Sequence, residues 1–414
     1  MDRISGLSDE LLVIILSFLP TKMAVSTSIL SKRWEHLWRW LPKLEYDDQN
    51  CSESSQCKRL KWFLLRGLAL HRAPVIESLR LKITNPYFKP DVMRLMVASA
   101  AFRNVRELDI HYSSFPGKSN ILPINFYTKR SLVFLKLDGG IFLDNPDMVC
   151  FHSLKTLQLQ GVAYFNEETL QRLLSSCPAL EELLVDISED DKMRKFTIIV
   201  PTLQRLSLYI PYFYDIDGFV IKTPSLKYLK LKDHNDKSHY CLIDNMPNLI
   251  EAYVDVECPD IKSLIGSITS VKRLTICSEA LYGEGFVFRQ LEHLKQCRCK
   301  EFSSKLLVSL LNDSPKVREL ELFEMHDHYY NGMIKWNQPD TVPGCILSSL
   351  QILNWSVYTG APDERNLAVY ILKNATHLKT TTIYSEECHV PKFEMIKELA
   401  LSSRASTTCQ LVFD

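Results

Sequence analysis

Thirteen short segments between residues 76 and 383 share one spacing of apolar residues, Leu-x-x-Leu-x-Leu, and this repetition restricts the fold more than any other feature of the sequence. Successive segments begin 20 to 33 residues apart, which is mostly the period of leucine-rich repeats. Their apolar positions are Ile76/Leu79/Leu81, Val105/Leu108/Ile110, Leu132/Leu135/Leu137, Leu154/Leu157/Leu159, Leu180/Leu183/Val185, Leu203/Leu206/Leu208, Leu226/Leu229/Leu231, Leu249/Ala252/Val254, Val271/Leu274/Ile276, Leu291/Leu294/Gln296, Val317/Leu320/Leu322, Leu350/Leu353/Trp355 and Leu378/Thr381/Ile383. The period predicts a solenoid of stacked repeats.

The last two apolar residues of each segment are one position apart, which is the period of a strand, so both point to the same side. Helix-like stretches lie between segments, at residues 91–102, 167–175, 304–311 and 364–373. We therefore expect an α/β solenoid with parallel strands, irregular where Gln296 and Thr381 break the apolar rule. Ordinary antiparallel structure with alternating leucines is the alternative, and thirteen segments in near register argue against it.

The strand positions that point away from this interior are chemically mixed. A patchwork of acidic, basic and aromatic side chains suits a folded protein or a peptide better than a polyanion. We hypothesise that this face binds a protein target, although each residue taken singly is also explained as solvated surface. The candidate target-binding residues are Glu107, Asp109, Glu182, Asp186, Arg205, Tyr209, Tyr228, Lys230, Lys232, Glu251, Tyr253, Asp255, Glu319 and Glu321.

The first forty residues predict three short helices. Ser8 is a suitable N-cap for a helix over residues 9–19 that ends before Pro20, because its side chain can accept from unbonded backbone N–H groups. Thr21 and Ser31 are similar N-caps for helices over residues 22–29 and 32–40.

Apolar residues surround the first of these helices on nearly every side: Leu11, Leu12, Ile14, Ile15, Leu16, Phe18 and Leu19. Forty residues cannot bury a self-sufficient core, so part of this surface must be covered. The cover is either another chain or the remainder of this one, and patterning alone favours neither.

Length and charge limit the possible partners. A chain of 414 residues with 46% hydrophobic residues can bury an extensive core. Its 49 basic and 49 acidic residues balance, so we expect no binding to nucleic acid or to membrane surfaces. The apolar run at residues 11–19 is too short to span a bilayer and follows acidic residues, unlike a signal peptide. We expect a soluble protein of the cytoplasm or the nucleus.

The sequence gives little sign of catalysis, metal or cofactors. In a reducing compartment the twelve cysteines are expected to be mostly structural, and Cys297 and Cys299 lack the spacing of a zinc site. Gly117-Lys118-Ser119 lacks the earlier glycine of a phosphate loop, and His326-Asp327-His328 is better explained as a polar loop than as a metal site. We predict no catalytic residues, no metal and no cofactor.

The N-terminal residues resemble the F-box of plant F-box proteins with leucine-rich repeats. The matching positions are Arg3-Ile4-Ser5, Leu7, residues 9–12, residues 15–22, Ala24-Val25, Thr27-Ser28, residues 30–34 and Leu37-Trp38. Many F-boxes have proline where this chain has Ser8. The resemblance implies that the module binds a Skp-type adaptor, and through it a cullin and a RING protein. The adaptor-binding residues would be Ile4, Leu7, Leu11, Leu12, Ile15, Leu16, Leu19, Pro20, Val25, Leu30, Trp34, Leu37 and Trp38.

The C-terminal residues resemble the FBD domain found at the end of many plant F-box proteins. The matching positions include residues 345–350, Trp355, Gly360, Glu364, residues 370–375, Leu378, residues 397–399 and residues 409–413. The pattern predicts strand, helix, strand, helix and strand over residues 351–357, 364–373, 379–384, 393–402 and 409–413, an arrangement that can cap the stack. The expected domains are residues 1–45 (F-box), 46–74 (connecting helical segment), 75–340 (repeats) and 341–414 (FBD).

These resemblances imply a non-catalytic substrate-recognition subunit of an SCF-type (Skp, cullin, F-box) ubiquitin ligase. The F-box would bind the adaptor and the repeats an unidentified protein substrate. Two alternatives stay open: a repeat scaffold that binds a partner without promoting ubiquitination, and an F-box receptor gated by a small molecule.

Overall fold

The computed structural model describes residues 4–49, 51–101, 104–113, 117–144, 148–189, 191–235, 237–299, 303–325, 335–386 and 390–414. The chain divides into two compact units. The first unit is Met1–Leu203 with Tyr214–Ile216, and the second unit is Gln204–Phe213 with Asp217–Asp414.

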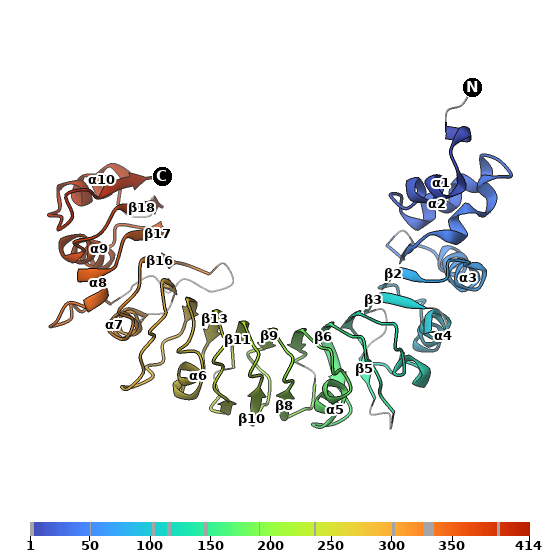
Figure 1. Cartoon of the computed structure of the whole chain (residues 1–414), viewed down its shortest axis with the longest axis horizontal. Helices are drawn as coiled ribbons and strands as arrows, with labels where there is room; N and C mark the ends of the chain where they lie inside the picture. The colour runs from blue at the N-terminus through green and yellow to red at the C-terminus, as the bar shows by residue number, and fades with distance from the viewer. Residues whose placement is uncertain are drawn as a thin grey trace. The chain divides into compact units, whose positions relative to one another are not determined.

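The first unit begins with short helices and continues as a parallel sheet. Its elements are η1 (Ile4–Gly6), α1 (Asp9–Leu16), α2 (Thr21–Ser26), η2 (Thr27–Ile29), η3 (Trp34–Trp40), β1 (Lys43–Asp47), α3 (Ser54–Leu70), β2 (Ile76–Ile83), α4 (Pro90–Ala101), β3 (Val105–Tyr112), η4 (Ile124–Phe126), β4 (Phe134–Gly139), β5 (Phe142–Leu143), β6 (Thr156–Tyr164), α5 (Thr169–Ser175), β7 (Glu182–Ile187) and β8 (Lys195–Ile199). The sheet order is β1-β2-β3-β4-β6-β7, with neighbouring strands parallel. Helices α3, α4 and α5 lie on the same side of it (Figure 1).

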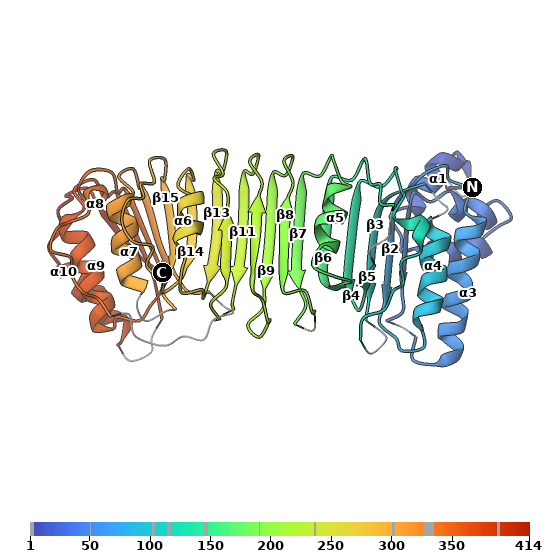
Figure 2. The same ribbon diagram turned by 90° about the horizontal axis from the view of Figure 1, so that it is seen from below.

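The second unit repeats the same arrangement. Its elements are β9 (Arg205–Ile210), β10 (Gly218–Lys222), β11 (Tyr228–Asp233), β12 (Tyr240–Ile243), β13 (Glu251–Val256), α6 (Lys262–Ser267), β14 (Arg273–Cys277), β15 (His293–Cys297), α7 (Ser303–Asp313), β16 (Glu319–Phe323), α8 (Gly344–Ser348), β17 (Ile352–Tyr358), α9 (Pro362–Asn374), β18 (Thr380–Ser385), α10 (Lys392–Leu401) and β19 (Gln410–Phe413). The parallel order is β9-β11-β13-β14-β15-β16-β17-β18-β19 (Figure 2). Each of the thirteen predicted segments forms a strand, so the predicted α/β repeat fold is confirmed.

Equivalent leucines of successive repeats stack in register. In the first unit Leu79 pairs with Leu108, and Leu108 pairs with Leu135 on its other side. In the second unit Leu206 pairs with Leu229. All five are at most 4% exposed. Each such leucine contributes about 1.5 to 3 kcal/mol once neighbouring repeats cover it, so the array is stable only as a stack.

The two polar residues at expected apolar positions, Gln296 and Thr381, pair in the same register as the leucines of other repeats. Gln296 pairs with Ile276 and Leu322 on the neighbouring strands. Thr381 pairs with Leu353 and is fully buried. The stacking of neighbours therefore decides the strand register at these positions, not the polarity of one side chain.

The N-terminal helices differ from their predicted boundaries. Helix α1 ends at Leu16 instead of residue 19, since the residue before a proline is disfavoured in helical geometry and the N–H groups of Phe18 and Leu19 bond three residues back. Thr21 does not cap the second helix: it lies inside α2, and its hydroxyl accepts from the Glu45 N–H at 2.8 Å.

The predicted cap at Ser31 is also wrong. The Trp34 N–H bonds to the Ser31 carbonyl in a turn, so the third helix starts later, at Trp34, and is a 3-10 helix. Such tight helices are usual in short connecting pieces.

One repeat strand before the predicted array was missed. β1 pairs in parallel with β2, with Leu44 beside Leu79 and Tyr46 beside Leu81. Its sequence signal is the spacing Leu41-x-x-Leu44-x-Tyr46, in which tyrosine takes the third apolar position. The connecting segment that follows contains the expected helix, α3.

At the other end, the predicted order of strand, helix, strand, helix and strand is confirmed by β17, α9, β18, α10 and β19. β19 pairs in parallel with β18 and continues the sheet. These elements extend the repeat stack, as the pattern of strands and helices in the sequence predicts.

Candidate functional site

The N-terminal helices form a small module, residues 4–41, and its Trp38 packs against Phe63 of helix α3, with ring centres 6.5 Å apart. Ser8 caps α1 as predicted, accepting from the Leu11 N–H at 3.4 Å. The Arg33 guanidinium binds Asp9 at 2.8 Å and also donates to the Leu7 carbonyl, which ties the start of α1 to the residues before η3. The buried apolar residues of the module are Leu12, Leu16, Ala24, Leu37, Trp38 and Leu41, each at most 8% exposed.

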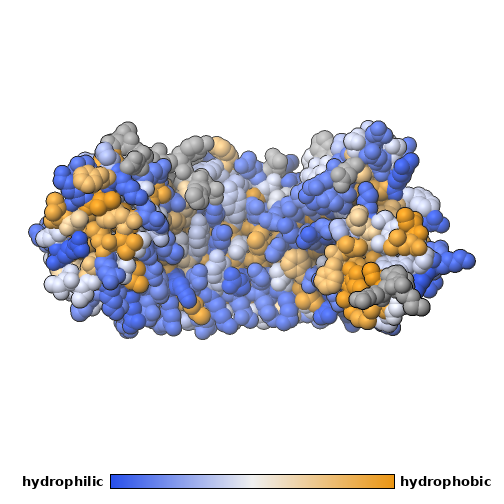
Figure 3. Space-filling model, turned by 90° about the horizontal axis from the view of Figure 1, so that it is seen from above, coloured by the Kyte–Doolittle hydropathy of each residue, from blue (hydrophilic) through white to orange (hydrophobic). Residues whose placement is uncertain are grey.

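A second set of apolar side chains in this module points to solvent. Helix α1 and the turn after it expose Leu11, Ile14, Ile15, Phe18 and Leu19, and the following residues expose Met23, Ile29 and Leu30. Phe18 is 82% exposed and Ile29 is 88% exposed. In the space-filling view hydrophobic residues gather on this part of the molecule (Figure 3). So large an apolar patch on one small module marks an interaction surface.

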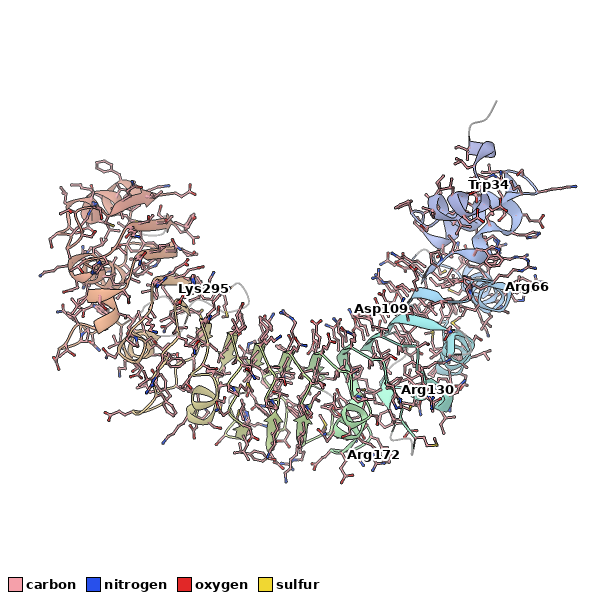
Figure 4. The ribbon with its side chains drawn as sticks, in the orientation of Figure 1. Trp34, Arg66, Asp109, Arg130, Arg172 and Lys295 are labelled. Atoms are coloured by element: carbon pink, nitrogen blue, oxygen red, sulfur yellow. The ribbon has the colours of Figure 1, made fainter. Side chains whose placement is uncertain are left out.

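The repeat strands of the first unit carry paired charges on the face opposite the helices. Asp109 accepts from Arg80 at 3.0 Å, and Arg80 also lies 3.5 Å from Glu45. Figure 4 places Asp109 on this face, while Arg172 lies on the helix side. Burial, followed by the charge of Asp138, raises the pKa of Asp186. Glu107 is exposed and Glu182 is half-buried.

In the second unit the same face mixes cations with aromatic rings. The Arg205 guanidinium lies 4.2 Å from the centre of the Tyr228 ring, and the Lys230 ammonium lies 5.3 Å from that of Tyr253. Such contacts contribute about 0.5 to 1 kcal/mol at exposed sites. Lys232 and Tyr209 are half-buried and Glu251 is exposed.

Further along this face the charges form cross-strand pairs. The Glu319 carboxylate lies 2.8 Å from Nδ1 of His293, and the Glu321 carboxylate lies 2.6 Å from the Lys295 ammonium (Figure 4). Opposite charges on adjacent strands stabilise the sheet modestly and leave a surface of alternating sign.

Comparison with known proteins identifies these parts. The F-box domain profile matches residues 4–46, the profile of the leucine-rich repeats of FBD-associated F-box protein At5g56370 matches residues 93–252, and the FBD profile matches residues 338–383. FBD-associated F-box protein At4g10400 of Arabidopsis thaliana is 58% identical over 414 residues, covering 100% of both chains. This chain belongs to the plant F-box/FBD/LRR-repeat family.

Two other F-box proteins of Arabidopsis thaliana are similar over nearly their whole lengths. FBD-associated F-box protein At5g38590 is 52% identical over 404 residues, covering 96% of this chain and 98% of its own. F-box/FBD/LRR-repeat protein At5g56420 is 40% identical over 424 residues, covering 100% and 99%. F-box proteins are generally non-catalytic adaptors of the ubiquitin pathway, and this family suggests a substrate-receptor role in SCF-type ligases.

The predicted adaptor-binding residues of the F-box fall into two groups. Ile4, Leu11, Ile15, Leu19, Pro20 and Leu30 are exposed, and Leu7, Val25 and Trp34 are half-buried. Leu12, Leu16, Leu37 and Trp38 are buried, so they hold the fold of the module and offer little surface to a partner. The most exposed apolar residues, Phe18 and Ile29, were not among those predicted.

Asp255 was predicted on the outward face of the repeats, but it is 1% exposed. Its carboxylate lies 3.0 Å from Nε2 of His234, and the His234 ring packs against Tyr212 with ring centres 4.9 Å apart. Residues that follow the strands therefore cover the carboxyl end of this face. Asp255 is part of that cover and not of the open surface.

Two motifs considered for catalysis have no support in the described residues. The Lys118 ammonium donates to the carbonyl of Gly161 and so occupies a structural position. His326-Asp327-His328 lies outside the described residues. In the described part of the chain, no helix is both long and apolar enough to cross a membrane.

Proposed function

We propose that this F-box protein is the substrate-recognition subunit of an SCF-type ubiquitin ligase. The exposed apolar patch of the F-box, which includes Phe18 and Ile29, would bind a Skp-type adaptor and through it a cullin and a RING protein. The observation that carries this proposal is that eight large apolar side chains between Leu11 and Leu30 stay exposed although the rest of this chain buries other apolar residues of the same helices. Apolar anchors of this kind dominate the energies of protein interfaces.

The repeats would bind the protein target through the outward face of their strands. The support is the alternation of acidic, basic and aromatic side chains, which suits a folded protein better than a polyanion. We expect no catalysis by this chain itself. Its contribution would be proximity, because holding a target lysine beside a charged conjugating enzyme makes the transfer effectively intramolecular.

We propose the domain boundaries expected from the sequence: residues 1–45 form the F-box, 46–74 the connecting segment, 75–340 the repeats and 341–414 the FBD region. We also propose that the protein acts in the cytoplasm or the nucleus. Cys177 and Cys345 are free, buried thiols, which agrees with a reducing compartment.

A binding experiment with the full chain and a Skp-type adaptor tests the F-box assignment. Phe18→Glu and Ile29→Glu should each weaken adaptor binding by at least about tenfold, since a charge covered by an apolar interface loses its solvation. Phe213→Glu is the matched control, because Phe213 is 84% exposed but lies outside the F-box. Adaptor binding that is equal in all four proteins would refute the proposal. Leu12→Asp and Leu16→Asp are unsuitable, because both side chains are buried and the module would unfold.

A second experiment separates a ligase subunit from a scaffold. Proximity labelling in plant cells with the proteasome blocked should identify the same target proteins for the wild type and for Phe18→Glu, whereas the adaptor, the cullin and the RING protein should be lost from the neighbours of Phe18→Glu. Ubiquitination of those target proteins should depend on Phe18. If the target proteins are ubiquitinated equally with both proteins, the chain is a scaffold.

A further inference from the structure

Three cysteines of the second unit converge at the carboxyl ends of two adjacent strands. Cys277 ends β14 and Cys297 ends β15, directly after the paired residues Ile276 and Gln296. Cys299 follows two residues later. The Sγ atoms of Cys277 and Cys299 are 3.3 Å apart, those of Cys297 and Cys299 are 3.0 Å apart, and all three lie within 4.8 Å of one another.

These sulfur atoms are in contact but are not bonded, because a disulfide requires about 2.05 Å. The thiols are 1%, 1% and 3% exposed, so the cluster is shielded from solvent. Three sulfurs around one metal ion at about 2.3 Å each would lie about 3.8 Å apart in tetrahedral geometry. The Cys277–Cys299 and Cys297–Cys299 pairs, now 3.3 Å and 3.0 Å apart, therefore need to open by only about 0.5 to 0.8 Å to enclose an ion.

A methionine packs against the group. Met325 packs against the three cysteines together with Tyr253 and Phe323, and the Tyr253 hydroxyl donates to the Met325 Sδ at 3.2 Å. Thiolate and thioether sulfurs are soft ligands that select Cu⁺ or Zn²⁺ over Mg²⁺ and Ca²⁺. Met325 is 8% exposed and Tyr253 is half-buried, so this side is the less covered approach to the sulfurs.

The charged neighbours of the cluster are already engaged. Asp255 of β13 is paired with Cys277 of β14, and its carboxylate accepts a hydrogen bond from His234. Arg298, between two of the cysteines, directs its guanidinium to Glu324 at 2.7 Å and to Glu364. Residues two apart in an extended chain point to the same side, which is why Cys297 and Cys299 meet while Arg298 points away.

We propose that Cys277, Cys297 and Cys299 bind one d10 metal ion, Zn²⁺ or Cu⁺, beneath the side chain of Met325. The ion would replace the thiol protons, which leave to solvent, and would join the carboxyl ends of β14 and β15. This site is independent of the proposed ligase function, because it lies in the second unit and needs no partner chain.

Metal titration of the purified full chain tests the site. The chain is stripped with a chelator under reducing, oxygen-free conditions and is then titrated with Zn²⁺ and with Cu⁺ against a competing chromophoric chelator. We expect one equivalent of one of these ions to bind, with release of protons and with a rise in Tm that grows with metal concentration. The titration that saturates at one equivalent, with Zn²⁺ or with Cu⁺, identifies the ion.

Variants separate this site from other thiols. Cys277→Ser and Cys299→Ser should abolish the one-equivalent binding and the metal-dependent rise in Tm. Cys345→Ser is the matched control, because Cys345 is fully buried in the same unit and its thiol donates to the Leu311 carbonyl at 3.1 Å. Far-ultraviolet circular dichroism checks that each variant folds. If neither ion binds the wild type at one equivalent, or if folded Cys277→Ser and Cys299→Ser bind as the wild type does, the metal site is refuted.

Discussion

Arg298 and Glu364 form an ion pair between the repeat array and the FBD region, and both side chains are 2% exposed. The Arg298 guanidinium also donates to the Val357 carbonyl at 2.6 Å and lies over the Trp355 ring. Val357 has a positive φ of 59°, unusual for a β-branched residue, in the irregular stretch of β17 where this carbonyl meets the arginine. Glu364 is one of the positions that resemble the FBD domain.

Removal of this buried carboxylate should destabilise the second unit. We expect Glu364→Gln to lower the free energy of unfolding by about 3 kcal/mol, because it leaves the Arg298 charge buried with only part of its compensation. Urea unfolding of the full chain measures the change. Glu398→Gln is the control: it breaks the more exposed Arg365–Glu398 pair, 38% to 39% exposed, and should cost less than about 1 kcal/mol. Equal losses in the two variants would contradict this role of Glu364.

A close approach of Gly67 to Tyr46 fixes helix α3 on the first repeat strand. A Cβ at Gly67 would lie 2.8 Å from the buried Tyr46 hydroxyl. Gly67→Ala should therefore destabilise the first unit by about 1 to 3 kcal/mol, as overpacked cores do. Gly344→Ala is the control, since nothing lies within 4 Å of the position its Cβ would take.

Removal of the tyrosine hydroxyl should rescue that variant. Among the described residues the Tyr46 hydroxyl has no hydrogen-bond partner, so Tyr46→Phe should be neutral or stabilising by itself. Combined with Gly67→Ala, it should restore most of the lost stability in the same urea experiment. A double variant as unstable as Gly67→Ala would show that the contact with the hydroxyl is not the cause.

The cap at Ser8 should control the local stability of α1. Loss of the side-chain acceptor in Ser8→Ala costs about 1 kcal/mol, so amide hydrogen exchange in α1 should be about fivefold faster, measured by mass spectrometry on the full chain. Ser8→Pro should keep α1 folded, because Ser8 already has a φ of −68° and a ψ of 160°, which proline adopts. Unchanged exchange in Ser8→Ala would exclude the capping role.

The repeat fold could be predicted from the sequence because its signal is local and repeated thirteen times. Two apolar residues one position apart define a strand with a buried side, and repetition at a steady period places equivalent residues side by side. The same reasoning failed where the third apolar position is aromatic. β1 was not predicted because Tyr46 takes the position that leucine, isoleucine or valine occupies in most other repeats. It also could not decide which side of α1 is buried, because apolar residues surround that helix.

The cysteine cluster was missed for a related reason. Spacing along the sequence separates Cys277 from Cys297 by a whole repeat, and no zinc-site spacing links them. In the folded stack both residues directly follow the third apolar position of their repeats, as Asp255 does in the repeat before. Residues at this position of adjacent repeats become neighbours, so aligning the repeats by register would have brought the two cysteines together.

The pair of His239 and Asp233 should make the second unit more stable in weak acid than in weak base. Burial opposes protonation of His239, but the hydrogen bond and charge of Asp233, 2.8 Å away, and the Lys237 carbonyl together raise its pKa above 6.5. A histidine whose pKa is higher in the folded state stabilises the fold fully at pH values below its pKa in the unfolded chain. This stabilisation is lost as the pH rises through its pKa in the folded state. Melting curves from pH 6 to pH 9 should therefore show a loss of Tm in the wild type that is smaller in His239→Gln. Substitution of the exposed His377 by Gln is the control and should keep the wild-type profile. Parallel profiles for the wild type and His239→Gln would mean that the imidazolium adds nothing to the fold.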